Sequence, residues 1–373
     1  MENRPLVPIF DGHNDTLLHV LGSYPRPRRD FFKRNESGHI DLPRAREGGF
    51  AGGFFAAFTT PDPATGGLDP DFERVVSDTR LPPPVGQYFA LNMTISLAAT
   101  LFRMEAESGG QFKVVRTAQE LRECFANGIV AAIFHIEGAE AIDAQFNSLE
   151  VLYQSGLRSL GLVWSRPNIY AEGVPFGFPL SPDTGPGLTA RGRELVRECN
   201  RRGILIDLSH LNEKGFWDVA EVTNAPLVAT HSNAHAVSAS ARNLTDRQLD
   251  AVKDSGGIVG VNFAVSFTRA DGGKDADTPL ESLATMFDYL CERMGVEHVA
   301  FGSDFDGTTI PAELGDVAGL QRLVDALRVK GFSEADLARL GTENWLRVLD
   351  ATWKQPPPGP MTPPDRPRAG ARL

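Results

Sequence analysis

Cysteine is scarce in this chain. Its 373 residues include only Cys124, Cys199 and Cys291, an odd number, and each lies in a segment with the apolar periodicity of an amphipathic helix. Three widely spaced thiols argue against both a disulfide framework and a cysteine-rich zinc cluster. We therefore predict reduced cysteines in or near the core.

Long apolar runs and an excess of basic residues are also missing. No uncharged apolar segment approaches the length of about 18 residues that a membrane-spanning helix needs, and the opening MENRPLVPIFDG has no apolar segment of signal-peptide length. The 37 Lys and Arg residues face 48 Asp and Glu residues, and the net charge of -11 opposes binding to phosphate backbones and anionic membranes. These features predict a cytoplasmic protein without a membrane anchor and without a nucleic-acid partner.

Eight short apolar runs rich in β-forming residues recur along the chain. Hydrophobic residues make up 42% of the sequence, which is ample for a core, and most segments between the runs have helical periodicity. Eight alternations of strand and helix predict an α/β fold, a (β/α)8 barrel of the TIM type. A doubly wound open sheet is the alternative, but no glycine-rich phosphate-binding fingerprint follows the first run. The predicted strands span residues 6–10, 51–58, 129–136, 159–164, 204–209, 226–231, 257–264 and 298–304.

Two long irregular segments interrupt the alternation, residues 60–84 and 165–188. Both follow predicted strands, so in a barrel they would lie as lids over the carboxyl-terminal face, where barrel enzymes carry their active sites. We predict that residues 1–352 form a single metal-dependent hydrolase barrel domain. The Pro-rich, basic segment 353–373 is predicted to be a disordered tail.

Side chains able to bind metal follow five of the eight predicted strands. Because the carboxyl ends of barrel strands share one rim, these side chains should converge. Three histidines and three carboxylates exceed the three protein ligands of a typical catalytic zinc site. Two ions sharing a carboxylate, roughly 3.5 Å apart, fit the number of ligands better. The residues are His13 and Asp15 after the first strand, Glu137 after the third, His210 after the fifth, His231 after the sixth and Asp304 after the eighth.

Five segments occur in a fixed order: DGHND, HIEGAE, DLSH, THSNAHAVSASARNLTDRQL and GSDFDG. In this order and strand context, and over residues 6 to 350, the chain resembles the membrane dipeptidase (renal dipeptidase) family of metallopeptidases, peptidase family M19, relatives of the amidohydrolase barrels. The resemblance implies two zinc ions per chain and a homodimer. It implies that His13 and Asp15 bind one ion, that His210 and His231 bind the other, and that Glu137 bridges both.

The resemblance also implies two further roles. Asp304 matches the family's proton shuttle, which passes a proton from the attacking water to the leaving amine. Arg242 matches the arginine that receives the terminal carboxylate of the substrate. Peptide hydrolysis needs an activated water, an electrophile for the carbonyl and an acid for the amine, and these residue types can supply all three.

One position departs from the family pattern. Some relatives carry a histidine after the fourth strand that contacts the tetrahedral intermediate, whereas this chain has Trp164 in LVWSRPN. An indole donates one hydrogen bond but neither accepts a proton nor binds metal. Either His135 or Arg166 supplies that contact, or the substrate preference has shifted.

Several other polar residues have structural interpretations. His135 lies two positions before Glu137, hence on the same side of its strand, and is expected to support the ligands without being one. Asp306 is interpreted as a turn residue beside Gly307, and His235 as a surface or helix-start residue. His19, His39 and His298 are expected to be structural as well.

The sequence thus predicts a binuclear zinc dipeptidase that hydrolyses small dipeptides, including L-Xaa-D-Xaa, with other divalent metals remaining open. An alternative is an amidohydrolase acting on a cyclic amide, a lactone or an N-acyl amino acid. The commonest amidohydrolases use His-x-His on the first strand and a lysine on the fourth, but here Asp15 replaces the second histidine and no lysine lies between Lys113 and Lys214. A non-catalytic ligand-binding barrel is a third hypothesis, against which the complete ligand set and Asp304 argue.

Overall fold

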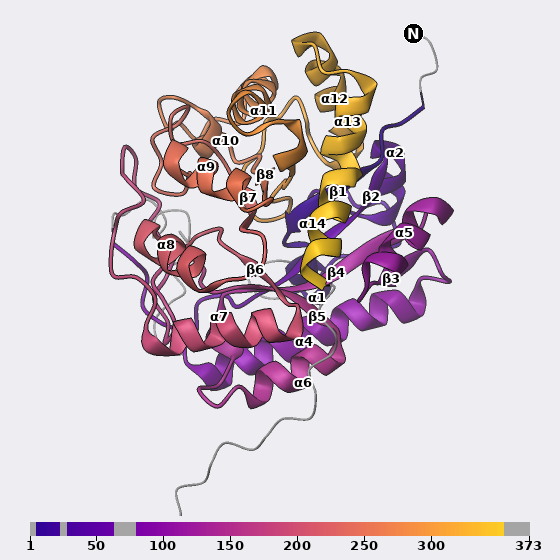
Figure 1. The fold of residues 1–373 in the computed structure, drawn as a ribbon. Helices are drawn as coiled ribbons and strands as arrows, with labels where there is room; N and C mark the ends of the chain where they lie inside the picture. Colours follow the sequence, from indigo (N-terminus) through magenta and orange to yellow (C-terminus); the bar gives the residue numbers. More distant parts are fainter. Residues whose placement is uncertain (1–4, 23–27, 63–79, 354–373) are drawn as a thin grey trace, which may run out of the picture.

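The computed structural model describes residues 5–22, 28–62 and 80–353, and these residues form a closed parallel barrel surrounded by helices (Figure 1). Each barrel strand pairs with its neighbours in chain order. The ring closes because β9 pairs with β1 and β2 pairs directly with β4. The strands are β1 (Ile9–Asn14), β2 (Phe50–Phe58), β4 (Val130–Glu137), β5 (Leu157–Gly161), β6 (Leu205–Asp207), β7 (Val228–Ser232), β8 (Ile258–Val261) and β9 (Val299–Phe301).

Eight strands in a closed ring confirm the predicted (β/α)8 barrel, and the open-sheet alternative is wrong. A further short strand, β3 (Phe112–Val114), pairs only with β4 and lies outside the ring. The first strand also begins later than predicted. Val7 bonds through its backbone to the side chain of Gln321 instead of to a neighbouring strand, and Pro8 has no N–H to donate. The strand also ends later than predicted, at Asn14, so His13 lies within β1 and not after it.

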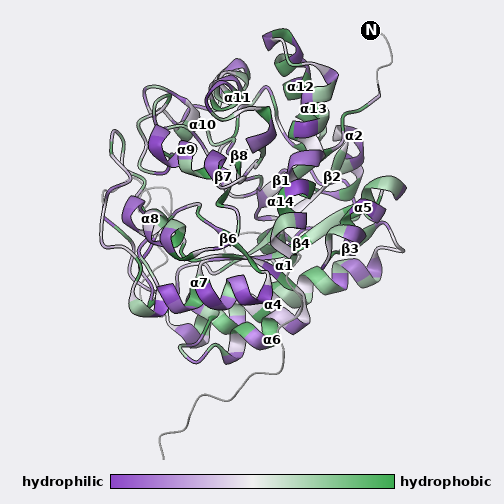
Figure 2. Ribbon diagram, in the orientation of Figure 1, coloured by the Kyte–Doolittle hydropathy of each residue, from purple (hydrophilic) through white to green (hydrophobic). Residues whose placement is uncertain are grey.

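Helices follow most strands and pack their apolar faces on the outside of the barrel. In α7 the hydroxyl of Thr189 accepts from the amide of Gly192 at the start, and Gly203 ends the helix with a φ of 68°. Figure 2 shows the outer side of α7 as largely hydrophilic. The helices are α1 (Thr16–Leu21), α2 (Leu42–Gly48), α4 (Gln87–Glu107), α5 (Ala118–Asn127), α6 (Asn147–Ser155), α7 (Ala190–Arg202), α8 (Glu213–Val222), α9 (Asp246–Asp254), α10 (Val265–Thr268), α11 (Glu281–Met294), α12 (Leu320–Lys330), α13 (Glu334–Ala338) and α14 (Asn344–Trp353).

The barrel interior near the amino ends of the strands is apolar and closed. Phe10 of β1 and Phe54 of β2 pack there with Trp345 of α14, whose ring centroid lies 4.9 Å from that of Phe54. The indole N–H of Trp345 donates to the carbonyl of Phe301 at 3.2 Å. Because this end is filled with hydrocarbon, the polar side chains of the barrel gather at the opposite, carboxyl-terminal end.

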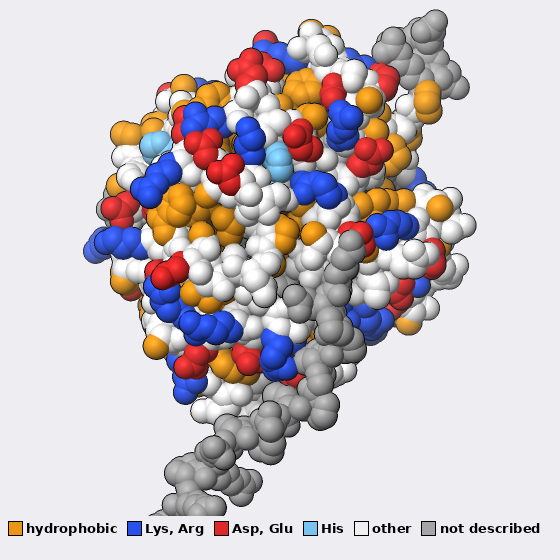
Figure 3. All heavy atoms as spheres, viewed as in Figure 1, with side chains coloured by type: hydrophobic (Ala, Val, Ile, Leu, Met, Phe, Trp, Pro, Cys, Tyr) orange, Lys and Arg blue, Asp and Glu red, His pale blue; other side chains and the backbone are white. Residues whose placement is uncertain are grey.

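The three cysteines are free thiols, buried at Cys124 and Cys199 and partly buried at Cys291, and each lies on a helix as predicted. The face seen in Figure 3 carries basic and acidic side chains interspersed. None of the helices in the described ranges combines the length and apolar character required to cross a bilayer. Residues 63–79 of the first predicted lid and 354–373 of the predicted tail lie outside the described residues, so the predicted domain boundary stays a prediction.

Candidate active site

The predicted ligands meet at the carboxyl ends of the barrel strands. His13 belongs to β1, with Asp15 directly after it, and Glu137 is the last residue of β4. His210 follows β6, and His231 lies in β7. All five side chains are buried. These five side chains therefore converge at the shared rim of the strands, as expected.

Glu137 lies at the centre of these ligands, and its two carboxylate oxygens face different histidines. Oε1 lies 2.9 Å from Nε2 of His210 and 3.7 Å from Nε2 of His231. Oε2 lies 3.5 Å from Nε2 of His13, which in turn is 3.7 Å from Oδ2 of Asp15. The ligands thus fall into two groups, one on each oxygen of a shared carboxylate.

The spacing of the ligand atoms suits metal ions. The Nε2 atoms of His210 and His231 lie 3.1 Å apart, close to the separation of about 3.3 Å expected for two nitrogens on one tetrahedral zinc at 2.0–2.1 Å. Both ring nitrogens of buried His13 lack a hydrogen-bond partner among the described residues. A buried imidazole of this kind, beside two carboxylates, fits a metal ligand.

Electrostatics favour a cation at this point. Burial disfavours the charged form of His13, but Glu137 and Asp15 outweigh it and raise the pKa of His13 well above its usual value. Burial and the nearby Arg242 guanidinium lower the pKa of His210 to about 4. Burial, with His13 and Arg242, holds the pKa of His231 well below its usual value. His210 and His231 are therefore neutral, which is the protonation state of a metal-binding imidazole.

Partners behind the ligands orient the rings. Nδ1 of His210 lies 2.8 Å from the Ser165 hydroxyl, and Nδ1 of His231 lies 2.8 Å from the Thr230 hydroxyl, so both Nε2 atoms point to Glu137. Thr230 also donates to Asp207 from its hydroxyl at 2.6 Å and from its amide at 2.8 Å. Asp207 thereby anchors the strand that carries His231.

His135 lies behind this layer of ligands. Its Nδ1 is 2.9 Å from the hydroxyl of Ser159, its Nε2 is 3.7 Å from Oδ2 of Asp207, and its ring centroid is 5.4 Å from that of His13. This is the supporting position expected for it. His135 is not one of the described residues that line the pocket.

Asp304 follows β9 in the left-handed region, with a φ of 60°, and His210 has a φ of 68°. Such backbone costs energy in non-glycine residues and concentrates at functional sites. Ligand atoms of His13, Asp15 and Asp304 lie within 4.8 Å of one another. Burial of the carboxyl, with Asp15 and Glu137 nearby, raises the pKa of Asp304 to about 7 against the opposing effect of His13. A group that titrates near neutrality is suited to carry a proton.

Asp306, two residues later, is structural. Its carboxylate is buried and accepts from the Thr16 hydroxyl at 3.0 Å and from the amide of His39 at 2.7 Å, and it lies 2.8 Å from Nη2 of Arg29. His19 and His39 contact the same turn, through the Asp306 carbonyl and amide. These contacts hold the turn that carries Asp304.

Arg242 is also buried, beside the histidine pair. Its Nε lies 3.0 Å from Nδ1 of His210, its Nη1 donates to the hydroxyl of Ser232 at 3.1 Å, and its Nη2 donates to the carbonyl of His231 at 3.1 Å. Burial lowers the pKa of Arg242 to about 10. One N–H on each terminal nitrogen remains after these bonds, so the guanidinium keeps donors for a carboxylate.

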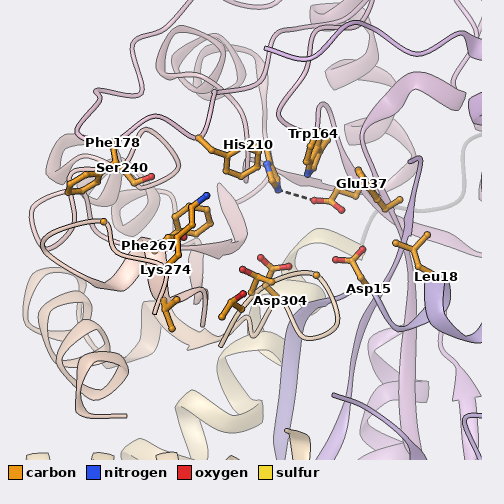
Figure 4. A pocket seen from close by; sticks show the side chains of 18 residues that line it. Asp15, Leu18, Glu137, Trp164, Phe178, His210, Ser240, Phe267, Lys274 and Asp304 are labelled. Atoms are coloured by element: carbon orange, nitrogen blue, oxygen red, sulfur yellow. Dashed lines mark ion pairs between the residues drawn. The ribbon is translucent and has the colours of Figure 1, made fainter. Parts of the chain in front are cut away.

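Above these residues lies a cavity of about 300 Å³, lined by Asp15, Glu137, His210 and Asp304 and by an aromatic wall (Figure 4). Trp164 belongs to this wall, and its ring centroid lies 6.0 Å from that of His210. Sequence reasoning missed the rest of the wall. The other residues of the wall are Phe58 of β2, Phe176 and Phe178 of the predicted lid at 165–188, and Phe267 of α10, which follows β8.

Arg166 does not take the place of the histidine that some relatives carry where this chain has Trp164. Nε of Arg166 lies 2.5 Å from Oε1 of Glu140, and its Nη2 donates to the carbonyl of Thr59 at 2.7 Å. Its guanidinium carbon lies 5.3 Å from the Trp164 ring centroid, behind the pocket wall. Arg166 thus supports the wall. His235 likewise supports the lid, because its Nε2 lies 3.2 Å from the carbonyl of Leu180.

A barrel that joins histidines and carboxylates at the carboxyl ends of its strands has the architecture of a metal-dependent hydrolase. The model of the membrane dipeptidase family (peptidase family M19) matches residues 5–355, so the chain belongs to this family. The predicted family is confirmed, and with it the class of enzyme, a metallo-dipeptidase.

Individual relatives agree with this assignment. A metallopeptidase from Rhodobacter sphaeroides, solved with a phosphinate mimic of the dipeptide L-Ala-D-Ala, is 50% identical, with a TM-score of 0.88 over 94% of this chain and 100% of that one. The dipeptidase AC of family M19 is also 50% identical, with a TM-score of 0.87 over 94% of this chain and 99% of that one. Dipeptidase verJ from Clonostachys rogersoniana is 31% identical over 348 residues, 92% of this chain and 84% of the relative.

Proposed function

We propose that this enzyme hydrolyses the peptide bond of small dipeptides with two zinc ions. His13 and Asp15 would hold one ion, His210 and His231 the other, and Glu137 would bridge both. The observation that carries the proposal is the arrangement of Glu137, with Oε1 2.9 Å from His210 and Oε2 3.5 Å from His13. Imidazole and carboxylate ligands suit zinc, although other divalent metals use the same groups.

The chain's own residues have distinct tasks in this proposal. Bound zinc would lower the pKa of the attacking water and polarise the scissile carbonyl. Asp304, whose carboxyl group lies beside His13 and Asp15, would take the proton of that water and return it to the leaving amine. Arg242 would hold the terminal carboxylate of the substrate with its remaining N–H donors. The aromatic wall, Trp164 included, would exclude bulk water and contact the substrate side chains.

The size of the pocket and the ligand of a relative support short substrates. A cavity of about 300 Å³ suits a molecule of dipeptide size. The Rhodobacter sphaeroides enzyme was solved with a mimic of L-Ala-D-Ala, and at 50% identity we extend this to L-Xaa-D-Xaa substrates for the present chain. Cyclic amides, lactones and N-acyl amino acids remain the alternative substrates. A homodimer and a cytoplasmic location stay predictions.

A hydrolysis panel tests this proposal directly. The full-length protein is assayed on L-Xaa-L-Xaa and L-Xaa-D-Xaa dipeptides, on N-acyl amino acids, lactones and cyclic amides, with the metal content measured on the same preparation. We expect zinc at two ions per chain and turnover confined to the dipeptides. Turnover of a lactone or an N-acyl amino acid in preference to every dipeptide would overturn the assigned substrate class.

A further inference from the structure

The pocket wall formed by the described residues contains a single Lys or Arg side chain, that of Lys274. Lys274 is exposed, and in Figure 4 it extends beside Phe267 into the cavity. It lies on the side of the pocket away from Asp15 and Leu18. The ammonium group of Lys274 therefore faces the part of a bound ligand that lies farthest from Asp15 and Leu18.

The acidic residues next to Lys274 in sequence are engaged elsewhere. Both carboxylate oxygens of Asp271 accept from Arg269, at 2.8 and 2.6 Å. Oδ1 of Asp275 accepts from the amide of Asp277 at 2.9 Å. Within the part of the chain that the structure describes, Lys274 forms no ion pair. Its charge is therefore available to a ligand in the pocket.

The segment that carries Lys274 is held in place. Gly272, with a φ of 66°, packs so closely against Phe178 of the 165–188 segment that a Cβ atom would lie 2.4 Å from its ring. The carbonyl of Ala276 accepts from the amide of Ala312 at 2.7 Å. These contacts fix the segment on both sides of Lys274, so its ammonium has a defined region of the pocket to reach.

A second cation, Arg242, lies just behind the pocket wall, where its Nε is 3.0 Å from Nδ1 of His210. The guanidinium carbon of Arg242 is 5.8 Å from the ring centroid of Phe267, the residue beside which Lys274 extends. Arg242 therefore lies between the predicted metal ligands and the part of the pocket that Lys274 reaches. A substrate whose terminal carboxylate binds Arg242 would bring the side chain of its C-terminal residue toward Lys274, which attracts a second negative charge.

We propose that Lys274 binds a carboxylate on the side chain of the substrate's C-terminal residue, and that the enzyme therefore prefers dipeptides ending in aspartate or glutamate. The proposal rests on the proposed function, because it assigns the terminal carboxylate itself to Arg242. Lys274 is then a specificity-determining residue. It does not act on the scissile bond.

The test compares dipeptides that differ only in this charge. Ala-Asp and Ala-Asn, each with an L or a D residue at the C-terminus, are assayed with the zinc-loaded parent, Lys274→Met, Lys274→Arg and Lys253→Met, which changes an exposed lysine of α9 as the control. We expect the parent to favour the Asp-ending peptide roughly two- to five-fold in kcat/KM, as one ion pair to an exposed lysine allows. The preference should fall to near one in Lys274→Met, remain in Lys274→Arg, and stay at the parent value in Lys253→Met. Added salt should weaken the preference for the Asp-ending peptide.

Binding separates this proposal from the proposed function. Phosphinate mimics ending in Asp and in Asn are titrated calorimetrically into the same four proteins, which requires no turnover. If neither dipeptide is hydrolysed, the proposed function fails, and the ratio of the two dissociation constants still decides the role of Lys274. A ratio near one in the parent would overturn the proposal. So would equal losses for both ligands in Lys274→Met, because the ammonium would then bind a group common to both.

Discussion

The side-chain amide of Asn262 donates a hydrogen bond of 2.9 Å to Oδ2 of Asp304. Asn262 is itself fixed, because its side-chain oxygen accepts from the amide of Ala264 at 2.7 Å and its backbone amide donates to the side chain of Asn233 at 3.1 Å. It follows β8, one strand away from Asp304, and sequence reasoning did not identify it. Its position indicates that the orientation of Asp304 is set by a neighbouring strand as well as by its own turn.

Replacing Asn262 by Leu removes this donor with little change in volume. We expect kcat to fall roughly ten-fold or more, because a misdirected carboxyl transfers protons poorly, with KM and metal content near the parent values. Steady-state kinetics and metal analysis on the same sample check this. A rise in KM at constant kcat would show that Asn262 contacts the substrate instead.

Asp304→Asn should abolish proton transfer and spare the site. A positioned acid–base group contributes on the order of 10²–10⁴ in rate, so kcat should fall by about two orders of magnitude or more. Zinc content and binding of a phosphinate dipeptide mimic should persist, because Asp304 is not assigned as a ligand. Turnover within a few-fold of the parent would mean that the proton travels by another route, with His135 the next residue to replace.

Gly307 lies against two carboxylates of the candidate site. A Cβ atom there would lie 2.2 Å from Oδ2 of Asp15 and 2.5 Å from Oδ1 of Asp304. Gly307→Ala should therefore displace both groups and lower both metal affinity and kcat, while Gly86→Ala, whose Cβ would meet nothing within 4 Å, is the matched control. Chelator competition and turnover measure the two effects. Parent-like metal affinity in Gly307→Ala would show that the Asp15 carboxylate can move without cost to metal binding.

Arg242 is expected to recognise the free carboxyl end of the substrate. Arg242→Met should lower kcat/KM for free dipeptides by about a hundred-fold, since a charge-assisted pair to a carboxylate contributes a few kcal/mol in a buried site. Because Nε of Arg242 also contacts the ring of His210, 3.0 Å from Nδ1, metal content is measured alongside. The parent should discriminate against C-terminally amidated dipeptides. Equal turnover of amidated and free dipeptides would remove Arg242 from substrate recognition.

The barrel and the convergence of the ligands were predictable for one physical reason. Each strand left an apolar run in the sequence, and parallel strands of a closed barrel bring their carboxyl ends to one rim, so His13, Glu137 and His231 had to approach one another. The three-residue strand β3 (Phe112–Val114) was missed because so short a segment shows no periodicity.

Contacts made by loops could not be predicted in this way. Phe178 and Lys274 reach the pocket from irregular segments whose course depends on tertiary packing, such as that of Phe178 on Gly272. The partner of Arg166 was equally hidden, because Glu140 ends the HIEGAE segment in a turn after β4, and nothing in that segment indicates a pairing with Arg166.

The bridging of two ions by Glu137 is the central claim, and metal content tests it most directly. Inductively coupled plasma mass spectrometry is applied to the parent, to Glu137→Gln and to Glu123→Gln, an exposed residue of α5 that serves as the control. We predict two tightly bound zinc ions per chain in the parent and in the control, and at most one in Glu137→Gln, because an amide bridges metal ions poorly. Two tightly bound ions in Glu137→Gln, or a single ion in the parent, would contradict the claim.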